Sequence, residues 1–178
     1  MRPIFLIGFM ACGKTTLGRA LEASAGIAFT DTDAEVEREA GMPVSEIFAR
    51  MGEAEFRRME TEALRRVCAE GGLRIVACGG GTPCHAGNME LMLGCGTVVW
   101  LEADTDITVR RLMDAPGQRP LATGKDAEEL RRLVECGKAR RLQYYSRAHS
   151  RFDSSRLDTD AEIEDTVRKF TDLYLLTE

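Results

Sequence analysis

Residues 8–15 read GFMACGKT and match the pattern G-x-x-x-x-G-K-[ST], which binds phosphate when it joins a strand to a helix. That context is present, because the apolar run 3–7 precedes the motif and a helical pattern over 15–25 follows it. Gly8 and Gly13 allow the backbone to curl until successive N–H groups and the N-terminus of the helix converge on an anion. The motif predicts a nucleotide-binding α/β domain.

Two side chains of this loop predict how the nucleotide is held. Lys14 brings a full positive charge to the β- and γ-phosphates, and the hydroxyl of Thr15 is a ligand for Mg²⁺. The other predicted nucleotide contacts in the loop are Ala11, Cys12, Gly13 and Thr16. The motif indicates a nucleotide and leaves the acceptor open.

The remainder of the chain alternates short apolar runs with longer helical stretches, which favours βαβ units and a parallel sheet. The pattern predicts four or five strands: 3–7, 27–30, 74–78 and 97–101, with 151–153 as the fifth. The predicted helices are 15–25, 104–114, 127–148 and 160–176, with a helix-rich stretch over 34–71 that is interrupted near 41–43 and at Gly52. Segment 115–124 is rich in turn-forming residues and is expected to be a mobile loop. At 178 residues, this pattern predicts a single three-layer α/β domain.

Charge and composition argue against several function classes. The net charge of −5 gives no general attraction for nucleic acid or an anionic membrane, so an anionic ligand needs local cationic groups. No apolar stretch approaches the roughly 18 residues of a membrane span. The six cysteines form no C-x-x-C pair and only two histidines are present, which argues against a zinc site. The cysteines are expected to be small buried side chains of a cytoplasmic protein.

Two carboxylates follow the second predicted strand, in Asp31-Thr32-Asp33. Parallel strands present ligands at their carboxyl ends, close to the phosphate loop. On an extended chain, side chains one residue apart point to opposite sides, so one carboxylate is expected to face Mg²⁺ and the other an acceptor hydroxyl. The alternative is a solvated turn in which Asp33 caps the next helix.

Two further features point to an acceptor site. Arg57 and Glu60 are i, i+3 neighbours on a predicted helix, so Glu60 can hold Arg57 in place, although most such pairs lie on the surface. Gly79, Gly80 and Gly81 follow a buried strand, and three glycines in a row lose much chain entropy on folding. Close approach of a ligand to the backbone is one explanation for them, and a tight turn is the other.

Six segments together resemble the shikimate kinase family in order and spacing: GFMACGKTTLGR, DTDAEVE, GEAEFRRMETEAL, CGGGTP, QRPLA and RRLQYYSRA. The resemblance implies a P-loop kinase fold with a five-stranded parallel sheet, an acceptor-binding region over about 33–60 and a lid over about 113–125. It also implies ATP, Mg²⁺ and phosphoryl transfer to the 3-hydroxyl of shikimate, giving shikimate 3-phosphate and ADP for aromatic amino-acid biosynthesis. The protein is also expected to be a cytoplasmic monomer that binds neither nucleic acid nor a membrane.

The resemblance assigns roles to the candidate acceptor residues. Asp33 matches the acid that contacts the acceptor hydroxyls and helps to take the proton, and Asp31 matches the one that organises Mg²⁺ through water. Arg57 matches an arginine that binds the shikimate carboxylate. The glycines 79–81 match backbone contacts to the acceptor, with Gly80 foremost.

The remaining assignments from the resemblance are arginines. Arg119 matches the lid arginine that closes on the ATP phosphates as a catalytic group. Arg140, four residues before Tyr144, matches a second arginine on the shikimate carboxylate, with the neighbouring Arg141 as the other possible register. Arg111 and Arg156 match positions beside the adenine.

The chain also departs from the family pattern. Ala11-Cys12 replaces the usual Gly-Ala of the phosphate loop, so the backbone at Ala11 must suit a residue with a Cβ atom, and Cys12 becomes a hypothetical oxidation site. Ala122 replaces a leucine of the lid.

Two other functions fit the same phosphate loop: a kinase for another polyol acid such as gluconate, and a catalytically idle relative that binds nucleotide as a regulator.

Overall fold

The computed structural model describes residues 2–85, 87–115 and 122–176. Within them, five strands form one parallel sheet in the order β2-β3-β1-β4-β5. The strands are β1 (Ile4–Ile7), β2 (Phe29–Asp31), β3 (Ile75–Ala77), β4 (Thr97–Glu102) and β5 (Ser150–Asp153). The predicted five-stranded α/β fold is confirmed, and all the carboxyl ends of the strands meet at one edge of the sheet.

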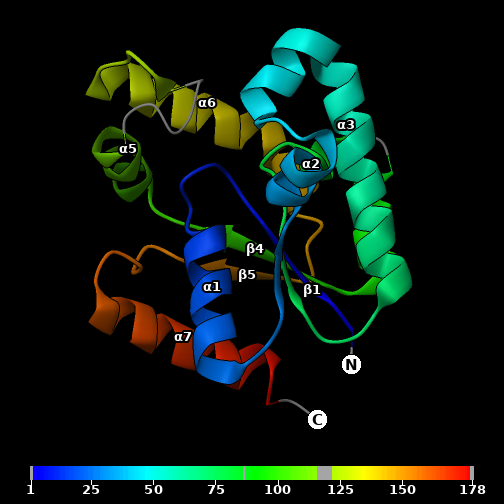
Figure 1. The fold of residues 1–178 in the computed structure, drawn as a ribbon. Coiled ribbons are helices and arrows are strands. Elements are labelled where there is room, and N and C mark those ends of the chain that lie inside the picture. Colours follow the sequence, from blue (N-terminus) through cyan, green and yellow to red (C-terminus); the bar gives the residue numbers. More distant parts are fainter. Residues whose placement is uncertain (1, 86, 116–121, 177–178) are drawn as a thin grey trace.

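The central strand β1 is apolar throughout because both faces of the sheet are covered. Its four residues are buried, and alternate side chains join different clusters. Ile4 and Leu6 pack with α1 (Lys14–Ala25) and α7 (Asp160–Tyr174), whereas Phe5 and Ile7 pack with α3 (Val44–Glu70) and α4 (Asn88–Cys95). Figure 1 shows α1 and α7 together on one side of the sheet. The domain therefore has three layers.

Two helix pairs stand above the carboxyl edge of the sheet. Helix α2 (Thr32–Ala40) packs on α3 through a separate apolar cluster that includes Val36, Ile47 and Phe56. The chain breaks at Gly41 (φ 66°) and kinks inside α3 at Gly52 (φ 82°), as predicted. Helix α5 (Thr105–Asp114) packs on α6 (Ala127–Tyr145), and the two lie side by side in Figure 1.

Part of the fold was not predicted. A short 3₁₀ helix, η1 (Thr82–Cys84), and helix α4 follow the three glycines, in a stretch where the sequence analysis placed no element. Helix α6 ends at Tyr145, three residues before its predicted end, because the chain turns there to enter β5. Of the predicted lid, residues 116–121 lie outside the described residues. Among the described helices, none is both long and apolar enough to cross a membrane.

The cysteines differ from the expectation of small buried side chains. Cys68 and Cys95 form a disulfide that joins α3 to the end of α4 across a sequence separation of 27 residues. Cys136 is exposed, and only Cys12 and Cys78 among the free cysteines are fully buried. The two bonded positions are far apart in the sequence, so no local pattern indicated the pairing.

Candidate active site

A cavity of about 1540 Å³ lies over the carboxyl edge of the sheet, between the α2–α3 and α5–α6 pairs. A smaller hollow of about 180 Å³ adjoins it and shares Asp33, Arg57, Gly79 and Gly80 with it. The structure brings most of the predicted site residues to the larger cavity: Ala11, Gly13, Lys14, Thr15, Thr16, Asp31, Asp33, Arg57, Gly79, Gly80 and Arg111. Gly81 lines the smaller one.

The phosphate loop has the backbone that its glycines predict, with one exception. Gly8 and Gly13 have positive φ values of 148° and 95°, and Gly13 is the N-cap of α1. Ala11 also has a positive φ, 58°, and is the only such non-glycine residue in the described chain. An L-residue in this region carries a cost of about 1–2 kcal/mol that glycine would not. The Ala11 substitution is therefore accommodated at the expense of local strain.

Two loop side chains differ in their access to the cavity. The Nζ of Lys14 donates to the carbonyl oxygens of Gly8 and Phe9, at 2.9 and 3.0 Å. It therefore lies over the loop, at the place where it can meet an anion. Cys12 is only 1% exposed and packs into the core behind the loop. Its thiol is shielded from oxidants in solution, which argues against the hypothesis of an oxidation site at Cys12.

Thr15 and Asp31 meet below the loop. The Thr15 hydroxyl donates to Asp31 Oδ2 at 2.9 Å, and Asp31 Oδ1 accepts from the backbone N–H of Asp33 at 3.1 Å. A hydroxyl and a carboxylate side by side are oxygen ligands of the kind that Mg²⁺ prefers. No group of three or more His, Cys, Asp or Glu side chains in the described residues forms a metal site by itself. A cation here would need further oxygens from phosphate or water.

The local geometry of the two aspartates corrects the sequence analysis. Asp31 ends β2 and is the N-cap of α2, so Asp33 lies in the first turn of that helix instead of on an extended chain. The alternation argument for their opposite directions does not apply, and the capping residue is Asp31, not Asp33. Asp33 nevertheless reaches the site, because it lines both the large cavity and the small hollow.

Arg57 and Glu60 form a buried pair, not a surface pair. Arg57 Nη1 donates to Glu60 Oε2 at 2.5 Å, and Glu60 is fully buried while Arg57 retains 21% exposure beside both hollows. Burial disfavours the charge on Arg57, but the charge and hydrogen bond of Glu60 outweigh it and raise the arginine pKa above its ordinary value. The site therefore presents a permanently cationic guanidinium.

Two of the three glycines are explained by side chains that approach them closely. A Cβ atom on Gly79 would lie 2.5 Å from Glu60 Oε1 and 2.7 Å from Asp33 Oδ1. A Cβ atom on Gly81 would lie 2.6 Å from Arg57 Nη2. For Gly80 the nearest atom, Gly8 O, would be 3.4 Å away, which is an ordinary contact. Gly79 and Gly81 thus leave room for the charged side chains of the site.

Of the two registers left open for the second acceptor arginine, the structure places Arg141 at the site and Arg140 away from it. Arg140 is exposed on α6 and lines neither the large cavity nor the small hollow, whereas Arg141 lines both of them. Arg141 lies 5.0 Å from the ring centroid of Phe9 and one helical turn before the buried Tyr145, whose hydroxyl donates to Gly80 O at 2.6 Å. Positions i and i+4 share a helix face, so Arg141 faces the site and Arg140 faces away.

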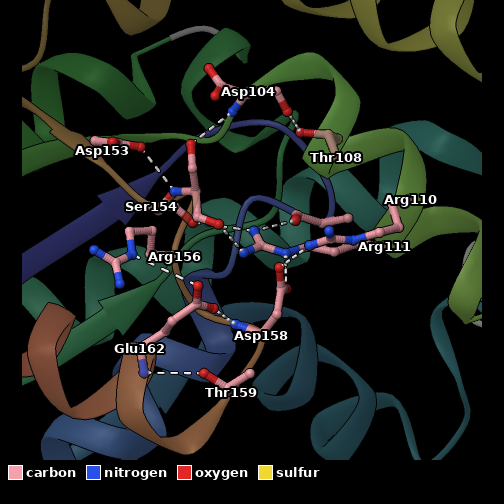
Figure 2. A network of polar contacts seen from close by, with 12 residues as sticks. Asp104, Thr108, Arg110, Arg111, Asp153, Ser154, Arg156, Asp158, Thr159 and Glu162 are labelled. Carbon is pink, nitrogen blue, oxygen red and sulfur yellow. Dashed lines mark hydrogen bonds and ion pairs between the residues drawn. The ribbon is translucent and has the colours of Figure 1, made fainter.

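Figure 2 shows how the predicted adenine-side arginines lie. Arg111 Nε pairs with Asp158 Oδ1 at 2.7 Å, and its guanidinium donates to Ala11 O, Ser154 O and Ser155 O at 3.0–3.3 Å. It thereby joins α5 to the phosphate loop and to the segment after β5. The side chain of Arg156 is 62% exposed, and its Nε lies 3.7 Å from Glu162 Oε1. Arg156 does not line the large cavity, so its predicted place beside the adenine is not supported. Arg119 lies outside the described residues.

Comparisons with known proteins agree with this geometry. The family model described as shikimate kinase matches residues 10–172. A shikimate kinase from Parabacteroides distasonis is 36% identical over 93% of this chain and 95% of its own. The chain belongs to the shikimate kinase family. The crystal structure of shikimate kinase from Bacteroides thetaiotaomicron superposes with a TM-score of 0.92 at 35% identity, covering 98% of both chains.

A second solved shikimate kinase, from Acinetobacter baumannii and in complex with shikimate, has a TM-score of 0.80 at 29% identity, covering 98% of this chain and 93% of its own. The sequence analysis named Arg141 only as the alternative to Arg140, and it missed three other residues that line the large cavity or the small hollow: Phe48, Phe56 and Arg110. For Arg141 a signal existed in its i, i+4 spacing from Tyr145. The others lie on helix faces that are decided by tertiary packing.

Proposed function

We propose that this protein transfers the γ-phosphoryl group of ATP to the 3-hydroxyl of shikimate, giving shikimate 3-phosphate and ADP. The observation that carries the proposal is that Arg57, Arg141 and Asp33 share one small hollow beside the phosphate loop. Two guanidinium groups match the carboxylate of the acceptor, and an aspartate matches its hydroxyls. The family uses ATP as co-substrate, and Lys14 lines the larger cavity, which Asp33, Arg57 and Arg141 also line.

In this proposal each residue has one task. Arg57 and Arg141 hold the carboxylate, and Asp33 orients the attacking hydroxyl and accepts its proton. Thr15, and Asp31 through water, would hold Mg²⁺, which neutralises charge on the phosphates when bound. Lys14 compensates charge on the transferred group, and closure of the region 113–125 would bring Arg119 to the phosphates. Residues 33–60 would then act as the acceptor-binding region.

Two parts of the proposal concern the protein as a whole. We propose that it works in the cytoplasm and as a monomer. The free thiols of Cys12, Cys78, Cys84 and Cys136 support a reducing compartment, and the Cys68–Cys95 disulfide argues against it.

The proposed reaction is tested by incubating the purified chain with ATP, Mg²⁺ and either shikimate or gluconate. We expect ADP to form with shikimate, and the product to carry phosphate on the 3-hydroxyl in its phosphorus and proton NMR spectra. Gluconate is expected to give only the background rate of ATP hydrolysis. Turnover of gluconate without turnover of shikimate would contradict the proposal, and ATP binding without transfer to either would indicate the regulatory alternative.

A matched pair of variants tests the acceptor arginine. Replacing Arg141 with alanine is expected to raise the KM for shikimate by about 10- to 100-fold, because charge-assisted hydrogen bonds contribute about 1.5–3 kcal/mol. Arg140→Ala removes the same side chain from the exposed face of the same helix and is expected to leave that KM within about twofold, as for surface changes. The KM for ATP should change little in both. A larger effect at Arg140 would show that the register from the sequence was right.

A further inference from the structure

We propose that Thr82 is a positioning residue: through Glu60, its hydroxyl fixes the guanidinium of Arg57 for the acceptor carboxylate. Thr82 Oγ1 donates a short hydrogen bond to Glu60 Oε1, while Arg57 Nη1 donates to Glu60 Oε2 at 2.5 Å. Thr82 and Glu60 are both 0% exposed. Each oxygen of the buried carboxylate is therefore held from a different side. The inference rests on the proposed function of Arg57.

Thr82 is itself held in place by backbone contacts on both sides. Its N–H donates to Gly79 O at 3.0 Å, and its carbonyl oxygen accepts from the Nδ2 of Asn88 at 3.0 Å. Asn88 is 0% exposed and begins α4. The hydroxyl is thus anchored on the sheet side of the site, whereas Arg57 and Glu60 belong to α3. The contact joins two separate elements, 22 residues apart in the sequence.

Glu60 is the main partner that orients Arg57. The other carboxylate near this arginine, Glu53, is 67% exposed and lies at 3.3–3.4 Å from Nη2 and Nε. An exposed, long ion pair contributes little orientation. Without the Thr82 hydroxyl, Glu60 Oε1 is left buried without that donor, and the carboxylate turns or shifts to recover one. Arg57 moves with it, because the guanidinium follows the oxygen to which it is bound.

The test is Thr82→Val, which keeps the shape and removes the hydroxyl. The KM for shikimate is expected to rise about fivefold or more, the effect of leaving one buried partner unsatisfied, while kcat and the KM for ATP change by about twofold or less. Thr82→Ser restores the hydroxyl and should restore the KM. If the valine variant does not fold, Thr82→Ala against Thr82→Ser gives the same comparison.

A control separates positioning from general destabilisation. Thr166 on α7 is also buried, and its hydroxyl donates to Arg156 O at 2.6 Å. Thr166→Val removes an equivalent hydrogen bond outside the acceptor hollow, so it is expected to lower stability and to leave the KM for shikimate unchanged. Equal KM values for Thr82→Val and the wild type, or equal increases in Thr82→Val and Thr166→Val, would overturn the proposal.

Two further readouts tie the effect to Arg57. In an Arg57→Ala background, Thr82→Val should cause no additional rise in the KM for shikimate, because the guanidinium that Thr82 positions through Glu60 is then absent. Failure of the proposed function is seen separately, as absence of shikimate turnover in the wild type. If the wild type does not turn over shikimate, the positioning of Arg57 by Thr82 is still tested by NMR. The signal of the Arg57 Nε–H group should shift or broaden in Thr82→Val and not in Thr166→Val. An unchanged Arg57 signal in Thr82→Val would overturn the proposal.

Discussion

Replacing Lys14 with alanine is expected to lower kcat by about 100-fold or more, as for loss of one preorganised electrostatic donor. Lys14 Nζ lies over the loop at 2.9 Å from Gly8 O, so the charge is already placed where the phosphates are predicted to bind. The net charge of −5 offers no general positive field to replace it. Charge on the transferred phosphoryl group would therefore go uncompensated.

The measurement for Lys14→Ala is kcat at saturating ATP and shikimate, with the far-ultraviolet circular dichroism spectrum as a check on the fold. Lys169→Ala is a suitable control, because Lys169 pairs with Asp165 on the exposed side of α7. That control is expected to keep wild-type turnover. Turnover near normal in Lys14→Ala would contradict the assignment of the nucleotide site.

Replacing Asp33 with asparagine is expected to lower kcat by about 10²- to 10⁴-fold, the range found for general acid–base groups. Asparagine keeps the size of the side chain, which comes close to Gly79. It loses the negative charge that orients the hydroxyl and accepts its proton. Because phosphoryl transfer depends strongly on positioning, the KM for ATP should change much less than kcat.

Asp31→Asn is the matched comparison for this second prediction. Asparagine is as good an N-cap as aspartate, so α2 should remain capped and folded. What is lost is a charged oxygen beside Thr15, so the defect is expected to be partly relieved by raising Mg²⁺. The measurement is kcat against Mg²⁺ concentration for both variants. Rescue of Asp33→Asn by Mg²⁺, without rescue of Asp31→Asn, would show that the two roles are reversed.

The sheet and the phosphate loop could be predicted because their signals are local. Buried runs such as Ile4–Ile7, and the glycines at positions 8 and 13, determine strand and loop within a few residues. Helix α4 had weaker signals. Its start at Asn88 follows three glycines and a proline that read as a turn, and no strong apolar periodicity marks Asn88–Cys95.

The residues of the active site could be predicted only where the spacing of residues along the sequence determines the direction of their side chains. The sequence could not decide between Arg140 and Arg141, because that choice depends on which face of α6 turns toward the core. The buried Tyr145 marks that face, and Arg141 lies on it. The helical position of Asp33 depends on where β2 ends and α2 begins, which sequence patterns locate least well. The contact of Thr82 with Glu60 joins distant segments, so no spacing rule indicates it.

The close approach of side chains to Gly79 and Gly81 also limits how this sequence can change over evolution or in the laboratory. Any residue larger than glycine at position 79 competes for space with the carboxylates of Asp33 and Glu60, and at position 81 with the guanidinium of Arg57. The loop glycines and the three charged side chains are therefore expected to vary together or not at all. A library that seeks a new acceptor must redesign the charges and the loop as one unit, whereas position 80 leaves room for a single independent change.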